Sequence, residues 1–150
     1  MMENESLFPN PKWLDYLVGL VKRDPDRLKD LGIADFRLAI KIEFEDGSDK
    51  TFGLILDGYD VDSQGEISGI DSFKPEATLS GSFDAFKEML DNIVENRGAD
   101  KFHTLNTLCL AEFPLRISSD DPIGRDKVYR YAETLQVIFD SLGLEAAKSG

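Results

Sequence analysis

The chain has 150 residues, and 17 lysine and arginine side chains against 29 aspartate and glutamate side chains give a formal net charge of −12. This length favours a single domain with a sizeable core, and an apolar content of 41% is typical of a globular protein. A strongly acidic chain lacks the basic surface that binds nucleic acid or an anionic membrane, so neither partner is expected. The simplest interpretation of the charge is that it keeps the protein soluble.

The cysteine content and the terminal segments indicate a compartment. The chain has one cysteine, Cys109, so no disulfide forms within it and a reducing environment is favoured. No apolar run reaches the roughly 18 residues of a membrane-spanning helix. Residues 1–10 are polar and acidic, unlike a secretory signal peptide. We therefore expect a cytoplasmic protein without stable membrane anchoring.

The N-terminal segment, residues 1–32, is predicted to form a pair of short helices. Asn10-Pro11 and Asp24-Pro25 are helix-start signals, because the first residue can cap and proline fits the first turn. Gly32 is expected to end the second helix in a left-handed conformation. Apolar residues recur at helical spacing after the first signal, at Trp13, Leu14, Leu17, Val18 and Val21.

Residues 36–44 then alternate strictly between apolar and polar side chains, which predicts a strand with one buried face. Asp46-Gly47 follows as a hairpin signal, and residues 51–56 are predicted to be the returning strand. Further along the chain we expect a loop over 57–65 and two short strands over 66–70 and 76–80.

The second half of the chain is predicted to be mainly helical. Ser82 is a good helix cap, and the helix that it starts is expected to stop at Gly98. Residues 99–109 fit a helix or a strand equally well. Residues 110–118 favour a strand, which Pro114 would place at an edge or a bulge. A last long helix is expected from Pro122 to Gly143.

This order of elements predicts an α+β fold: an antiparallel or mixed sheet of about five strands, with helices covering one face. Residues 1–150 are interpreted as one domain, with a frayed tail over 143–150.

The sequence gives little support for catalysis. His103 is the single histidine, and six residues separate it from Cys109, so the two would share a helix face poorly. One Cys and one His cannot supply a zinc site, and no nucleotide-binding glycine motif is present. The acidic segment from Asp60 departs from the EF-hand pattern at its twelfth position, Asp71, and its flanks are predicted strands. We expect no enzyme activity, no cofactor and no metal.

Three explanations remain open for the surplus of apolar residues in the second half of the chain. They fit an apolar cavity between sheet and helices, a packed core, or a subunit interface such as that of a homodimer. A small enzyme acting on a lipid-like substrate is a further alternative. Its bases would be carboxylates of Asp57, Asp60, Asp120 or Asp121, although helix capping explains the last pair more simply.

One segment, residues 76–90, supports an apolar cavity between sheet and helices. It reads Glu-Ala-Thr-Leu-Ser-Gly-Ser-Phe-Asp-Ala-Phe-Lys-Glu-Met-Leu and resembles the strand and helix of the sterol carrier protein type 2 family. The alternating strand, turn and returning strand upstream match the same order, so the resemblance covers about residues 33–98. It implies an α+β domain with a hydrophobic tunnel that carries a sterol, fatty acid or other lipid without bond chemistry.

We therefore predict noncatalytic binding of an apolar small molecule or lipid, with a protein-interaction or oligomerisation module as the alternative. The candidate ligand-binding residues are inferred from the apolar faces of the two later helices. They are Phe83, Phe86, Met89, Leu90, Tyr131, Leu135 and Phe139.

Overall fold

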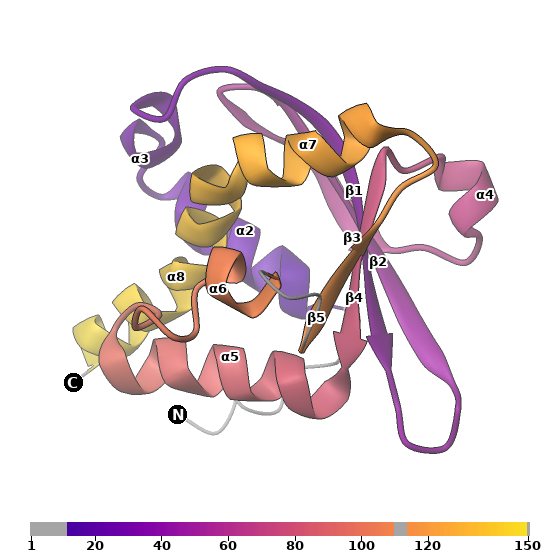
Figure 1. Ribbon diagram of the computed structural model, residues 1–150. Helices are drawn as coiled ribbons and strands as arrows, with labels where there is room; N and C mark the ends of the chain where they lie inside the picture. The colour runs from indigo at the N-terminus through magenta and orange to yellow at the C-terminus, as the bar shows by residue number, and fades with distance from the viewer. Residues whose placement is uncertain (1–11, 110–113, 150) are drawn as a thin grey trace.

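The computed structural model describes residues 12–109 and 114–149, and it arranges them as one sheet packed against a layer of helices (Figure 1). In chain order the elements are α2 (Trp13–Lys22), α3 (Asp26–Lys29), β1 (Ala34–Glu43), β2 (Asp49–Gly58), β3 (Asp60–Glu66), α4 (Ile70–Phe73), β4 (Ala77–Ser82), α5 (Phe83–Asn96), α6 (Leu105–Cys109), β5 (Leu115–Ser118), α7 (Pro122–Arg130) and α8 (Ala132–Ser149). The α+β class expected from the sequence is confirmed.

The sheet has five strands in the order β3-β2-β1-β4-β5. It is mixed, because β1 pairs antiparallel with β2 and parallel with β4, while the β2–β3 and β4–β5 pairs are antiparallel. Strand β5 therefore lies at an edge, as the proline before it predicted.

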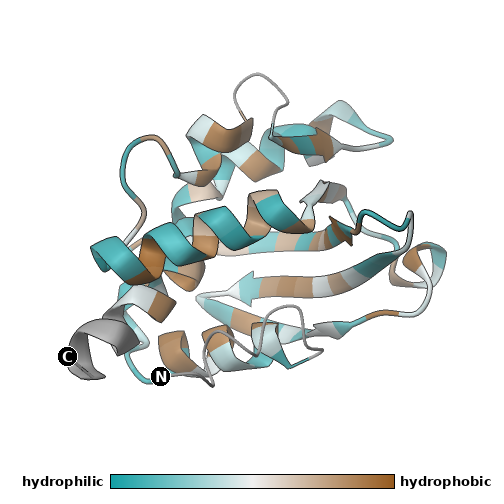
Figure 2. Cartoon of the chain, turned by 90° about the horizontal axis from the view of Figure 1, so that it is seen from below, coloured by the Kyte–Doolittle hydropathy of each residue, from teal (hydrophilic) through white to brown (hydrophobic). Residues whose placement is uncertain are grey.

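The hydrophobic core lies between one face of this sheet and α2, α5, α6, α7 and α8. Alternation in β1 points Phe36, Leu38, Ile40 and Ile42 to that face, and all four side chains are fully buried. Figure 2 shows polar and apolar residues mixed along the helices, which is typical of helices that bury one face. Helix α5 begins as predicted, because Ser82 Oγ accepts a hydrogen bond from the Ala85 amide at 3.1 Å.

The segment between β2 and β4 differs from the prediction. Residues 60–65, expected to be loop, lie in strand β3 (Asp60–Glu66), whereas Ile70–Phe73, whose first residue was expected to be strand, form the short helix α4. The sequence pattern did not predict strand β3, because it is an edge strand whose side chains are polar or exposed apart from the buried Val61. The acidic segment from Asp60 to Asp71, which departs from the EF-hand pattern, thus contains strand β3 and the start of helix α4.

Helix α4 also shows that the helices do not all cover one face of the sheet. It lies on the face opposite α2, α5 and α8 (Figure 1), where a Cβ atom on Gly53 would be 2.6 Å from the Phe73 ring. Arg37 stacks over the same ring at 4.7 Å, so a glycine and a cation–π contact hold α4 on the outer face.

The C-terminal helix is divided and longer than predicted. Tyr131 leaves the helical conformation with φ −105° and ψ 18°, which separates α7 from α8. Helix α8 then continues past Gly143 to Ser149. Gly143 does not end the helix; instead it allows close approach to the end of α5, since a Cβ atom there would be 2.7 Å from the Ile93 carbonyl oxygen. At the other terminus, the predicted cap at Asn10-Pro11 lies outside the described residues.

Candidate ligand cavity

A small apolar cavity lies between the β4–β5 side of the sheet and the helices α6, α7 and α8. It has about 10 Å³ of space open to the centre of a water molecule, which is room for about one water. The lining residues are Leu79, Leu105, Asn106, Cys109, Ile117, Val128, Tyr129, Ala132 and Leu135. Since ligand pockets usually measure about 300–1,000 Å³, a lipid chain requires this space to widen.

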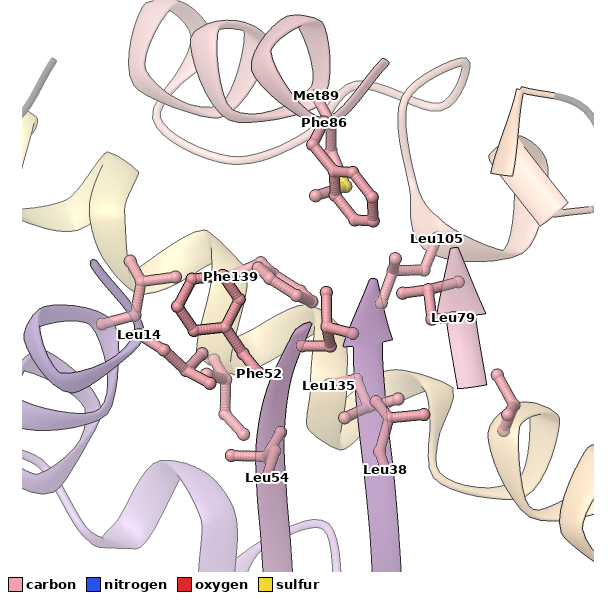
Figure 3. Close-up of a cluster of buried hydrophobic side chains, with 14 of the residues drawn as sticks. Leu14, Leu38, Phe52, Leu54, Leu79, Phe86, Met89, Leu105, Leu135 and Phe139 are labelled. Atoms are coloured by element: carbon pink, nitrogen blue, oxygen red, sulfur yellow. The ribbon is translucent and has the colours of Figure 1, made fainter. Parts of the chain in front are cut away.

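The floor of the cavity is part of the sheet. Leu79 of β4 and Ile117 of β5 are paired across the antiparallel ladder, so their side chains point to the same face. Figure 3 shows Leu79 close to Leu105 of α6, with Leu135 of α8 nearby. Apolar side chains from the sheet, from α6 and from α8 therefore meet at one place.

Helix α7 forms one wall and is held to the sheet by its backbone. A Cβ atom on Gly124 would lie 1.9 Å from the Glu76 carbonyl oxygen, so only glycine permits this approach. Asp121 caps the helix by accepting a hydrogen bond from the Ile123 amide at 2.9 Å, which confirms the capping interpretation.

Polar side chains fix α7 further. Lys127 Nζ donates to Glu76 Oε2 at 2.5 Å and to the Asp35 carbonyl oxygen at 3.0 Å. These contacts raise the pKa of Lys127, mainly through the Glu76 hydrogen bond. Arg125 donates to the Ile117 carbonyl oxygen at 2.8 Å, so α7 is joined to β1, β4 and β5 together.

Helix α6 forms the opposite wall and is only five residues long. Its first amide, that of Leu105, donates to Gln136 Oε1 of α8 at 2.8 Å. Asn106 and Tyr129 line the cavity and are also exposed to solvent, so the mouth of the cavity lies between α6 and α7. Cys109 is buried, and burial raises the pKa of its thiol to about 11, which keeps the thiol protonated and weakly reactive.

Of the seven ligand residues predicted from the sequence, Leu135 lines this cavity. Phe86, Met89 and Leu90 are buried in the core on α5, and Phe139 stacks on Trp13 with ring centroids 6.2 Å apart. The remaining two are half-buried: Phe83 stacks on Phe44, and Tyr131 packs against Phe36.

Sequence reasoning missed the other eight lining residues. Each occupies an ordinary apolar or exposed position in its own element, and no local pattern distinguishes a side chain beside a void from one beside another side chain. The single usable signal was the pair of small residues, Cys109 and Ala132, on segments that were otherwise rich in large apolar residues.

The candidate bases of the enzyme alternative lie outside this cavity. Asp57 and Asp60 face each other at the β2–β3 turn, and Asp120 and Asp121 precede α7. Among residues 12–109 and 114–149, no group of three or more histidine, cysteine, aspartate or glutamate side chains is placed to hold a metal ion. Within the same ranges, no helix combines the length and apolar character that crossing a membrane requires.

Known proteins resemble this chain in structure rather than in sequence. No protein-family model and no curated protein matches the sequence. A crystal structure of sterol carrier protein 2 aligns over 89% of this chain and 95% of its own length, with a TM-score of 0.66 at 9% identity. The solution structure of the conserved hypothetical protein TT1886 from Thermus thermophilus covers 86% and 82%, with a TM-score of 0.59 at 11% identity. The chain therefore has the fold of sterol carrier protein 2, as the resemblance of residues 76–90 predicted.

Proposed function

We propose that this protein binds an apolar small molecule or the apolar part of a lipid, without catalysis, in the cavity between β4–β5 and α6–α8. The observation that carries the proposal is the apolar cavity itself, which has a mouth between two helices. Support comes from the fold, which is shared with a protein described as a sterol carrier.

Occupation of the cavity requires α6 to move outward, because about 10 Å³ of open space holds no more than one water molecule. Burial of a lipid chain can drive this movement, since each CH₂ group removed from water contributes about 0.8 kcal/mol. Helix α7 is fixed by Gly124 and Lys127, whereas α6 is short, so α6 is the wall that yields. In this arrangement the ligand contacts Leu135 first and approaches Met89 and Phe86 of α5 as the core opens.

The chemistry of the lining residues supports binding rather than reaction. Described residues contribute one amide, one phenol and one protonated thiol to the cavity, and no carboxylate or imidazole. We propose that the ligand is carried unchanged and is handed to another protein in the cytoplasm. The net charge of −12 opposes collision with an anionic bilayer as the route of delivery.

The test is uptake of a fluorescent fatty acid by delipidated protein, compared with an Ala132→Leu variant that fills the cavity. Ala132 is 5% exposed, so the larger side chain has nowhere else to go. We expect the variant to bind about tenfold more weakly, equivalent to ~1.4 kcal/mol. Ala85→Leu, which enlarges a partly buried residue of α5 outside the cavity, is the matched control and should bind normally.

Two results would contradict the proposal. One is absence of uptake by the unmodified protein at high protein concentration, when native mass spectrometry also finds no co-purified ligand. The other is equal binding by the unmodified protein and Ala132→Leu, which would place the ligand elsewhere. Native mass spectrometry reports assembly in the same measurement, so a tight dimer without ligand would favour the interaction-module alternative.

A further inference from the structure

His103 lies between two carboxylates that belong to different parts of the chain. Its Nδ1 atom is 2.8 Å from Asp100 Oδ1, and its Nε2 atom is 3.1 Å from Glu88 Oε2. Asp100 is on the loop that joins α5 to α6, and Glu88 is on the outer face of α5. The imidazole thus connects the loop to the helix.

The two contacts together require the charged form of the ring. A neutral imidazole has one N–H group and can donate to one carboxylate, whereas the imidazolium can donate to both. The Asp100 hydrogen bond, followed by the Glu88 contact, raises the pKa of His103 against the opposing effect of partial burial. Asp100 responds in the opposite direction, and its pKa is lowered mainly by the hydrogen bond to His103.

Other charged groups lie in the same groove or on the elements packed beside it. The groove in which His103 lies is lined by further α5 side chains, of which Lys87 is basic and Asp84, Asp91 and Glu95 are acidic. On its own loop, Lys101 precedes it and stacks on Phe102 at 5.2 Å. On α8, Asp140 accepts a hydrogen bond from the Ala99 amide at 3.1 Å. Acids outnumber bases among the charged residues that line this groove.

This loop leads directly into α6, the cavity wall that the proposed function requires to move. Helix α6 begins two residues after His103 and supplies Leu105, Asn106 and Cys109 to the lining. Within the loop, Asp100 is also bonded to Asn92 of α5 through its amide and its carboxylate, both at 3.0 Å. Of the hydrogen bonds that the described loop residues make to α5, the His103–Glu88 contact lies nearest to the start of α6, so its loss frees the end of the loop that precedes α6.

We propose that His103 is a pH-sensitive latch that holds α6 closed over the cavity when the ring is protonated and releases it when the ring is neutral. The proposal rests on the proposed ligand cavity, whose opening it would regulate. The latch contributes fully at a pH below the unfolded-state pKa of about 6.5 and is lost as the pH rises through the higher folded-state value. Opening should therefore increase from mildly acidic to mildly alkaline pH.

The reactivity of Cys109 measures this opening without any ligand. Cys109 is the single cysteine of the chain and is a buried residue of α6 itself, so dithiodipyridine reaches it only when this wall opens. The rate is compared between the unmodified protein and His103→Gln at each pH, because the ratio cancels the intrinsic pH dependence of the thiol. We expect His103→Gln to react several-fold faster near pH 5.5, and the two rates to converge above pH 8.

A ratio that stays constant over this range, or a slower reaction of His103→Gln, would overturn the latch. Glu88→Gln provides a second variant that keeps the imidazole and should also react faster at acidic pH, whereas Glu95→Gln in the same groove should not. The failure of the two proposals can be told apart. A pH-dependent ratio without lipid uptake at any pH would retain the latch and remove the carrier function, and uptake with a flat ratio would do the reverse.

Discussion

The two halves of the core differ in how they are filled. Beside β1 and β2, the Trp13 ring packs edge-on against Phe52 at 5.6 Å and stacks on Phe139 at 6.2 Å. Beside β4 and β5, Leu79, Leu105 and Leu135 lie close together (Figure 3), and they line the small cavity with other mostly apolar side chains. Large rings fill the first half, whereas the small residues Cys109 and Ala132 are among those that line the space in the second half.

The halves also differ in what holds them together. Packing dominates in the aromatic half. In the cavity half, α7 is fixed by a glycine contact and by Lys127, while α6 is held by Gln136 and by the loop before it. Local opening of a helix as short as α6 can leave the rest of the chain folded, which is what a ligand site with a closed resting state requires.

The largest expected effect on stability comes from replacing a leucine by alanine in each half of the core. Leu14→Ala, in the aromatic half, should lower the free energy of unfolding by about 4 kcal/mol, because the rings around it cannot collapse into the space. Leu105→Ala should cost about 2 kcal/mol, since the short helix α6 can move inward. Urea denaturation of both variants measures the difference. Equal costs would contradict the distinction between a rigid half and an adaptable one.

A smaller effect is expected where α7 touches the sheet. Gly124→Ala places a Cβ atom against the Glu76 carbonyl oxygen and should destabilise the protein by about 2–3 kcal/mol. Gly19→Ala is the control: it lies within α2 with no atom near its Cβ position, and alanine there should stabilise by about 0.5–1 kcal/mol. Thermal melting of the two variants should show shifts of opposite sign; a neutral Gly124→Ala would show that α7 is free to move.

The smallest effect concerns the Lys127–Glu76 pair. Lys127→Met should cost about 1 kcal/mol at neutral pH, because the pair is partly exposed and partly screened. The pKa of Lys127 is raised above 10.5, so the stabilisation is complete below the unfolded-state pKa and is lost as the pH rises through the folded-state value. Urea titrations should therefore show a smaller difference in unfolding free energy between the two proteins at pH 11 than at pH 7. A difference that is the same at both pH values would assign the effect to packing.

Much of the fold could be predicted where the sequence pattern was long. Nine alternating residues identified β1, and a serine cap followed by an apolar stripe identified α5. Strand β3 could not be predicted, because its ladder depends on pairing with β2 and on one buried side chain, Val61. The break at Tyr131 was equally hidden, since both sides of it keep a helical pattern.

The site was harder to predict than the fold. Periodicity identifies which face of a helix is buried, but it does not say whether a buried side chain meets an atom or a void. Leu135 was selected for its face and lies at the cavity. Phe86 and Phe139 were selected in the same way and lie in packed surroundings. The difference arises from the neighbours that the sheet order brings together, and that order involves contacts across dozens of residues.

The most direct test of the ligand cavity is nuclear magnetic resonance of methyl-labelled protein with a bound fatty acid. We expect nuclear Overhauser contacts from the acyl chain to the methyl groups of Leu79, Leu105 and Leu135. We expect none to Leu14 and Leu54, which lie in the aromatic half of the same core. Contacts to Leu14 and Leu54, or contacts confined to exposed residues such as Ile33 and Phe102, would contradict a ligand site between β4–β5 and α6–α8.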